Sequence, residues 1–204
     1  MTTIATTTET TTELLPRLRH CTGPLHEDIE ALLRLEAPMP IARYGRIVQG
    51  FHEFLTLWEM RVRHALPERL RPWFDERQRA PFAARDIAAL GLTQDLAMRD
   101  AARAAQHRIM LDSPATAIGS LYVLEGSALG GQVLTRQLAG QGLTPDRGAA
   151  YFHGYGERTG AMWREFRALA QDTAGGDAAS RTAACKAAVQ TFKALIETFG
   201  ALDR

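Results

Sequence analysis

A histidine and a glutamate four residues apart, His26 and Glu30, have the types and the spacing of a metal-binding pair on a helix. Residues at i and i+4 lie on one face of an α-helix, so the carboxylate can accept a hydrogen bond from the imidazole nitrogen that does not bind the metal. Ile29 and Leu33 follow His26 by three and seven residues, which places the histidine beside an apolar stripe and predicts that it faces inward. Glu30 could equally be an ordinary solvated carboxylate.

Arg19 lies seven residues before His26. On one continuous helix the two side chains would share nearly the same face, about 10 Å apart. Gly23 and Pro24 lie between them, however, and proline kinks or breaks a helix interior. We therefore expect a break near residue 23 and two helices rather than one.

Three glycines, Gly126, Gly130 and Gly131, interrupt an otherwise strongly helical segment. Each glycine costs a helix interior roughly 0.5–1 kcal/mol relative to alanine, so three within six residues indicate a functional or closely packed site. Gly126 and Gly130 lie on one helical face and leave it without side chains. Such a face admits either a second helix or a flat ligand.

These residues are positioned by helices throughout the chain after residue 12. Runs rich in Ala, Leu, Arg and Glu dominate and alternating β-branched stretches are absent, so we predict an all-α, single-domain bundle of seven or eight helices. Breaks are expected at Ala37–Pro40, Leu66–Pro67, Ala80–Pro81, Gly140–Pro145 and Gly175–Gly176. The predicted helices span residues 14–22, 25–35, 41–64, 66–74, 83–107, 114–139, 158–171 and 180–200.

Composition excludes several classes of protein. Residues 1–12 contain eight threonines and are predicted to be a disordered tail rather than a signal peptide, with residues 13–204 forming the domain. The formal net charge of +1 gives no global attraction to nucleic acid, and no apolar run approaches the roughly 18 residues of a membrane span. Two cysteines, Cys21 and Cys185, without a CxxC motif support no disulfide framework or iron–sulfur site. We expect a cytoplasmic protein.

Two segments resemble the heme oxygenases. Residues 18–30 (LRHCTGPLHEDIE) are similar to the proximal helix of that family, and residues 121–134 (LYVLEGSALGGQVL) to its distal helix. The similarity continues through residues 51–66, 154–163 and 191–195, so it covers nearly the whole chain after the threonine-rich segment. The type is bacterial, similar to heme oxygenases that supply biliverdin to bacteriophytochromes.

The resemblance implies a fold with heme b between the proximal and distal helices and a role for each matched residue. His26 would be the axial iron ligand oriented by Glu30. Gly126, Gly130 and Gly131 would let the distal backbone lie against the heme. The residues implied at the heme propionates and the pocket wall are Arg19, Tyr122, Arg164 and Phe192. The implied reaction cleaves heme to biliverdin, iron and carbon monoxide with O2 and external electrons.

One departure from the family concerns proton delivery. Many members carry an aspartate in the distal motif where this chain has Ser127. A hydroxyl cannot replace the charge of a carboxylate, so proton delivery would depend on Ser127, backbone carbonyls and water. The same departure supports an alternative function, a heme-binding carrier or sensor without turnover.

Other enzymes on helical folds are less consistent with the residues. A di-iron site expects Glu-x-x-His pairs, and none of the six histidines has a glutamate three residues before it. A thiaminase-like hydrolase would need a cysteine in its pocket, and a purely structural bundle would leave the glycines to packing alone.

No flavin or iron–sulfur signature is present, so a ferredoxin or flavoprotein reductase is the implied electron donor. Arg17, Arg19 and Arg43 could form its docking site or an ordinary solvated surface.

Overall fold

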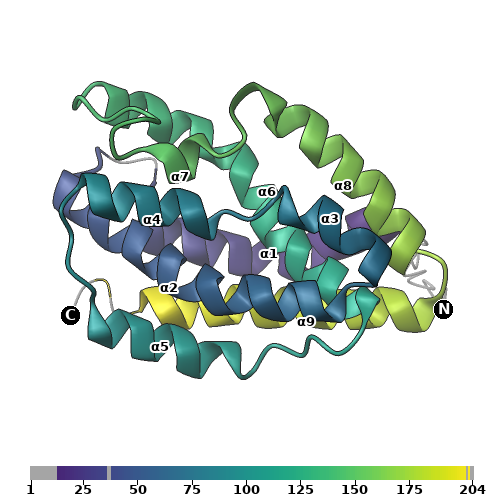
Figure 1. The fold of residues 1–204 in the computed structure, drawn as a ribbon. Coiled ribbons are helices and arrows are strands. Elements are labelled where there is room, and N and C mark those ends of the chain that lie inside the picture. Colours follow the sequence, from purple (N-terminus) through teal and green to yellow (C-terminus); the bar gives the residue numbers. More distant parts are fainter. Residues whose placement is uncertain (1–12, 36–37, 201, 203–204) are drawn as a thin grey trace, which may run out of the picture.

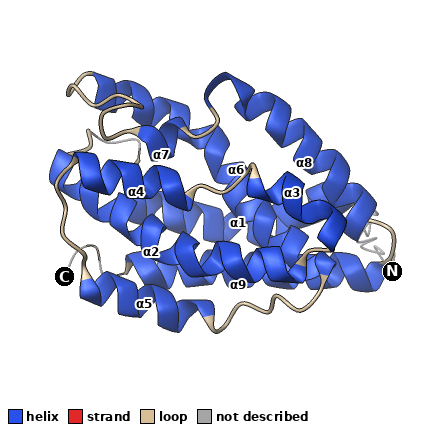
Figure 2. Ribbon diagram, viewed as in Figure 1, coloured by secondary structure: helices blue, strands red, loops and turns tan. Residues whose placement is uncertain are grey.

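The computed structural model describes residues 13–35, 38–200 and 202, and within these ranges it contains helices and no strand (Figure 2). The all-α prediction is therefore confirmed. The threonine-rich segment predicted as a disordered tail, residues 1–12, lies outside the described residues. In chain order the helices are α1 (Leu14–Leu33), α2 (Ile41–Ala65), η1 (Glu68–Leu70), α3 (Arg71–Asp75), α4 (Ala80–Ala89), α5 (Leu96–Gln106), α6 (Pro114–Ala139), α7 (Ala150–His153), η2 (Gly156–Arg158), α8 (Thr159–Ala174) and α9 (Ala178–Phe199).

The predicted break at Gly23–Pro24 is wrong, because α1 runs continuously through Pro24. Proline removes one helical hydrogen bond. Burial of a long stripe offsets this loss, since α1 buries one residue in nearly every turn on the side that faces the bundle: Leu14, Leu18, Thr22, Ile29 and Leu33. Arg19 and His26 consequently belong to one helix.

The single helix predicted for residues 83–107 is also wrong, because it is divided into α4 and α5. Gly91 between them adopts a positive φ of 63°, a conformation that glycine reaches without strain. Asp95 then begins α5 by accepting a hydrogen bond from the backbone N–H of Met98. The Ala80–Pro81 pair begins α4 instead of breaking a helix, since the first turn needs no proline N–H.

The helices pack around α6 and α9, which lie side by side through the centre of the bundle (Figure 1). Gly119 of α6 permits this close approach, because a Cβ there would overlap the carbonyl oxygen of Ala184 in α9. A buried polar chain fixes how the helices are rotated: Trp58 Nε1 donates to Ser120 Oγ over 2.8 Å, and Ser120 Oγ lies 2.6 Å from Thr191 Oγ1. The helix α6 begins at the predicted residue 114, with Ser113 as the N-cap and Pro114 in the first turn.

No helix among the described residues is both long and apolar enough to cross a membrane.

Candidate functional site

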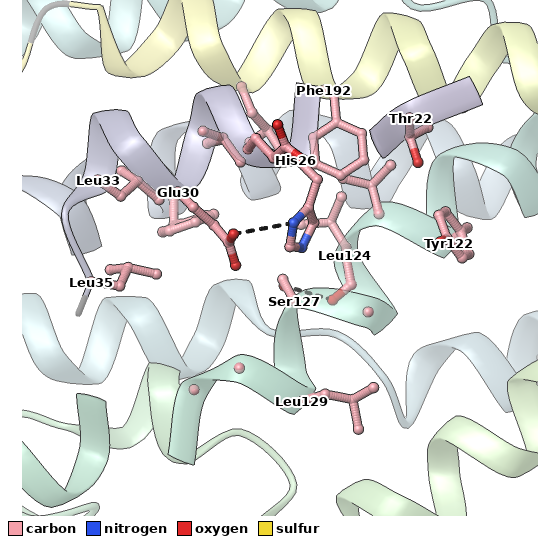
Figure 3. Close-up of a pocket in the computed structure, with 18 of the residues that line it drawn as sticks. Thr22, His26, Glu30, Leu33, Leu35, Tyr122, Leu124, Ser127, Leu129 and Phe192 are labelled. Atoms are coloured by element: carbon pink, nitrogen blue, oxygen red, sulfur yellow. Dashed lines mark hydrogen bonds and ion pairs between the residues drawn. The ribbon is translucent and has the colours of Figure 1, made fainter. Parts of the chain in front are cut away.

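A cavity of about 530 Å³ lies between α1, α6 and α9 (Figure 3). In Figure 3, His26 and Glu30 extend from α1 on one side, and Ser127 and Leu129 belong to α6 on the other. The walls between them are apolar and include Ile29, Leu33, Leu35, Phe51, Phe152 and Leu195. The structure therefore brings the histidine segment and the glycine segment to opposite sides of one space.

His26 opens into this cavity and contacts Glu30 as its spacing predicts. Its Nδ1 lies 3.4 Å from Glu30 Oε2, with the two side chains 56% and 58% exposed. The imidazole also meets the ring of Phe192 from α9 in an edge-to-face arrangement, with centroids 5.9 Å apart and planes at 73°. Glu30 engages Nδ1, which leaves Nε2 available to a ligand in the cavity.

The three glycines of α6 are not equivalent. A Cβ built on Gly126 or on Gly130 meets no atom within 4 Å, so both positions border open space. A Cβ on Gly131 would overlap the carbonyl oxygen of Phe152 in α7. Gly126 and Gly130 thus present bare backbone to the cavity, whereas Gly131 borders the cavity and also permits the close packing of α6 on α7.

Arg19 and Tyr122 lie at the end of the cavity nearest the start of α1. They also line an adjoining open groove together with Trp163, Arg164 and further residues of α8. The structure therefore places Arg164 in this groove and not among the residues of the main cavity. Burial raises the pKa of Tyr122 against the opposing effects of its hydrogen bond with Thr22 and the charge of Arg19, so the phenol stays protonated at neutral pH.

A buried arginine that the sequence did not single out supports Ser127. Arg79, in the loop before α4, donates from Nη1 to the carbonyl oxygen of Leu124 over 2.9 Å and to Ser127 Oγ over 3.0 Å. Ser127 Oγ in turn donates to the Leu124 carbonyl oxygen over 2.8 Å. The guanidinium also lies over the ring of Tyr151, 4.4 Å from its centroid. Arg79 is nearly fully buried. The sequence does not indicate this burial, because charged residues are mostly exposed.

A second arginine of the same loop, Arg77, holds Glu125 of α6, two residues before Ser127. Arg77 Nη1 lies 2.9 Å from Glu125 Oε2, and the two side chains are only 1% and 4% exposed. Tyr155 donates to Glu125 Oε1 over 3.2 Å. Burial raises the pKa of Glu125 even though Arg77, Arg79 and Tyr155 favour its charged form. This network fixes the helix on the side that faces away from the cavity.

Replacement of Arg77 by methionine should lower the free energy of unfolding by about 3–5 kcal/mol near pH 7, because it leaves the Glu125 carboxylate buried and unpaired. A folded-state pKa above the unfolded value means that Glu125 favours folding most at low pH and less as pH rises through the folded-state pKa. The loss of unfolding free energy in Arg77→Met should therefore become smaller as the pH is lowered towards 5. Urea unfolding across this pH range measures it. The double variant Arg77→Met/Glu125→Met should recover much of the stability at pH 7, and a defect in the single variant that does not change with pH would contradict the argument.

The described residues thus form an all-α protein with a ligand-sized cavity between a histidine-bearing helix and a glycine-bearing helix. The sequence model of the heme oxygenase family matches residues 12–201, so the chain belongs to the heme oxygenase family. It is 30% identical over 129 residues to a heme oxygenase of Xanthomonas campestris pv. campestris (strain 8004), an alignment that covers 63% of this chain and 68% of that protein. The NO- and CO-bound heme oxygenase of Neisseria meningitidis has the same fold, with a TM-score of 0.65, 21% identity and 92% coverage of both chains.

Proposed function

We propose that this enzyme binds heme b in the cavity between α1 and α6, with His26 as the axial iron ligand. We further propose that it cleaves the heme to biliverdin, iron and carbon monoxide with O2 and external electrons. The observation that carries this proposal is that the imidazole of His26 and the bare backbone of Gly126 and Gly130 border one apolar cavity from opposite helices.

The residues present fit a heme. A volume of about 530 Å³ lies within the range of roughly 300–1,000 Å³ that is usual for small-molecule and cofactor sites. Glu30 orients the imidazole through Nδ1, as a carboxylate commonly does for a metal-bound histidine. The ring of Phe192 limits rotation of the imidazole from the α9 side. A macrocycle between the two helices would thus meet the imidazole of His26 on one side, and the bare backbone of Gly126 and Gly130 on the other.

The polar groups at one end of the cavity suit the carboxylates of heme. Arg19 offers a planar guanidinium, and the protonated phenol of Tyr122 offers a hydrogen-bond donor. We propose that these two residues hold the propionates. Arg164 lies further along the adjoining groove and is a candidate for a propionate that extends out of the main cavity.

The protein supplies position and protons, while bound heme supplies both the iron that activates O2 and the ring that is cleaved. The single hydroxyl proton of Ser127 is directed to the Leu124 carbonyl oxygen, and Arg79 donates to the same hydroxyl oxygen. Ser127 can therefore accept a hydrogen bond from a water molecule in the cavity but cannot donate one without giving up its bond to Leu124. We infer that Arg79 holds Ser127 as a fixed acceptor that orients water beside the glycine surface.

Removal of the Ser127 hydroxyl tests this inference. We expect Ser127→Ala to bind hemin normally and to form product about tenfold more slowly, at the lower end of the loss that follows removal of a group that orients a catalytic partner. Arg79→Lys should cause a similar loss, since an ammonium cannot reproduce the paired donors to Leu124 and Ser127. Single-turnover rates at saturating hemin measure both, and full activity in Ser127→Ala would exclude the hydroxyl from proton delivery.

The proposed activity itself is tested with purified protein and stoichiometric hemin, followed by a ferredoxin and reductase system in air. Loss of the Soret band with release of biliverdin and iron supports the proposal. A Soret band that persists under these conditions would instead support the second candidate, a heme carrier or sensor, which the engaged hydroxyl of Ser127 favours. The absence of any Soret band would exclude both.

We also propose that a ferredoxin or flavoprotein reductase donates the electrons, that the site of action is the cytoplasm, and that a bacteriophytochrome accepts the biliverdin. The donor proposal rests on the chemistry, because oxidative cleavage of heme by O2 consumes electrons that must come from an external reductant. The acceptor proposal rests only on the resemblance to bacterial heme oxygenases.

A further inference from the structure

The interface between α1 and α9 contains both cysteines of the chain, close to the heme cavity. Cys21 of α1 donates from Sγ to the carbonyl oxygen of Leu18 over 3.3 Å, and the same sulfur lies 4.0 Å from the carbonyl oxygen of Cys185 in α9. Both are free thiols. Cys185 is 9% exposed and Cys21 is partly exposed, so the pair lies at the edge of the core, where a small oxidant can reach it from the surface.

Charge at this interface favours a thiolate. Arg17 lies one turn before Cys21 and reaches across to α9, where its Nη2 donates to Thr182 Oγ1 over 3.1 Å. The neighbouring Cys21 thiol and the charge of Arg17 lower the pKa of Cys185, against the opposing effect of burial. The lowered pKa favours the Cys185 thiolate, which is the form that reacts with peroxides and disulfides.

We propose that Cys21 and Cys185 are an oxidation site, at which hydrogen peroxide converts the two thiols into a reversible disulfide that links α1 to α9. In the first step the Cys185 thiolate attacks one peroxide oxygen, the O–O bond breaks, and a sulfenic acid and hydroxide form. In the second step Cys21 attacks the sulfenic sulfur, and the S–S bond forms as water leaves. Two thiols lose two electrons in total, and one peroxide is reduced to two waters.

The position of this pair connects it to the heme cavity. Thr22 directly follows Cys21 and lines the cavity. Phe192 lies seven residues after Cys185, two turns along α9, where its ring meets the ring of His26. A disulfide would therefore fix the spacing of the two helices that carry the proposed iron ligand and its aromatic neighbour. Transient disulfides are the kind found in reducing compartments, so the site agrees with the proposed cytoplasmic location.

Mass analysis of the full-length, ligand-free protein tests the proposal without reference to heme turnover. Dilute protein is treated with hydrogen peroxide, alkylated, and digested with trypsin without reductant. The result expected is loss of both free thiols and one linked pair of peptides, 20–34 with 182–186, from monomeric protein, with full recovery of both thiols after dithiothreitol. Retention of both thiols, stable oxidation to sulfinic acid without a linked peptide, or a link found only in covalent dimers would each overturn it.

Two sets of variants separate the roles of the residues. Cys21→Ser should convert the reaction of Cys185 into sulfenic acid, trapped by dimedone, and Cys185→Ser should leave Cys21 largely unreacted. Arg17→Gln keeps both thiols and should slow disulfide formation several-fold, whereas Arg103→Gln, an exposed arginine on α5, should not. An unchanged rate in Arg17→Gln, with circular dichroism confirming the fold, would exclude Cys185 as the attacking thiolate.

Discussion

Replacement of His26 by alanine is expected to abolish specific heme binding while leaving the fold intact. The side chain contributes to no buried packing that the fold requires, since it is more than half exposed and opens into the cavity. We expect hemin affinity to fall by more than about 100-fold, which exceeds the loss of roughly 10–100-fold caused by removal of a hydrogen-bond partner of a metal ligand. Absorption titration with hemin measures the change.

Two matched variants define this result. His20→Ala removes an exposed histidine of the same helix that does not line the cavity, and it should bind hemin as the unchanged protein does. Glu30→Ala keeps the ligand but releases Nδ1, so its loss of affinity should be smaller, about tenfold. Added imidazole should restore a Soret band in His26→Ala. Unchanged hemin affinity in His26→Ala would assign the iron to another residue.

Alanine substitutions at the α6 glycines are expected to separate stability from activity. Gly126→Ala and Gly130→Ala place a methyl group in open space, so the ligand-free protein should fold and gain roughly 0.5–1 kcal/mol from the better helix propensity of alanine. The same methyl groups would stand between the helix backbone and a bound heme. We expect both variants to retain His26 ligation and to lose most of the rate of biliverdin formation.

Gly131→Ala should instead destabilise the ligand-free protein. Its methyl group would overlap the Phe152 carbonyl oxygen, and separation of α6 from α7 should lower the free energy of unfolding by about 1–3 kcal/mol before any heme is added. Gly119→Ala is the control for backbone overlap outside the cavity, because it meets the Ala184 carbonyl oxygen of α9. Urea unfolding of the ligand-free variants, followed by single-turnover assays, compares all four. Normal turnover in Gly126→Ala and Gly130→Ala would mean that these glycines do not border the heme.

The helical fold could be predicted from the sequence because local signals agree with the tertiary structure along most of the chain. The start of α6 lies at the predicted residue, Pro114, and Ser113 caps it. The two errors are opposite in kind: a break predicted at Gly23–Pro24 does not occur, and a break that was not predicted occurs at Gly91. Tertiary burial carries α1 through Pro24.

The site could be predicted only in part. Residues on one helix have a spacing that can be read directly, so the contact of His26 with Glu30 was accessible. Arg79 was not, because its hydrogen bonds to Leu124 and Ser127 join residues 45 and 48 positions apart and exist only after α6 packs on the loop before α4. Gly131 packs against α7, whereas Gly126 and Gly130 border open space. This difference likewise depends on where α7 crosses α6, and no local sequence pattern predicts it.

The walls of the cavity have a thermodynamic consequence. They come mainly from α1, α6 and α9, with further residues from α2, α7 and α8, so no contiguous segment of the chain contains the site. A ligand of this cavity would bind the assembled bundle and not the unfolded chain, so its binding free energy would add to the stability of the whole domain. At a free ligand concentration one hundred times Kd, this linkage amounts to about 2.7 kcal/mol. Release of the cleaved product would remove this stabilisation. The bundle would therefore alternate between a more stable and a less stable state in each catalytic cycle.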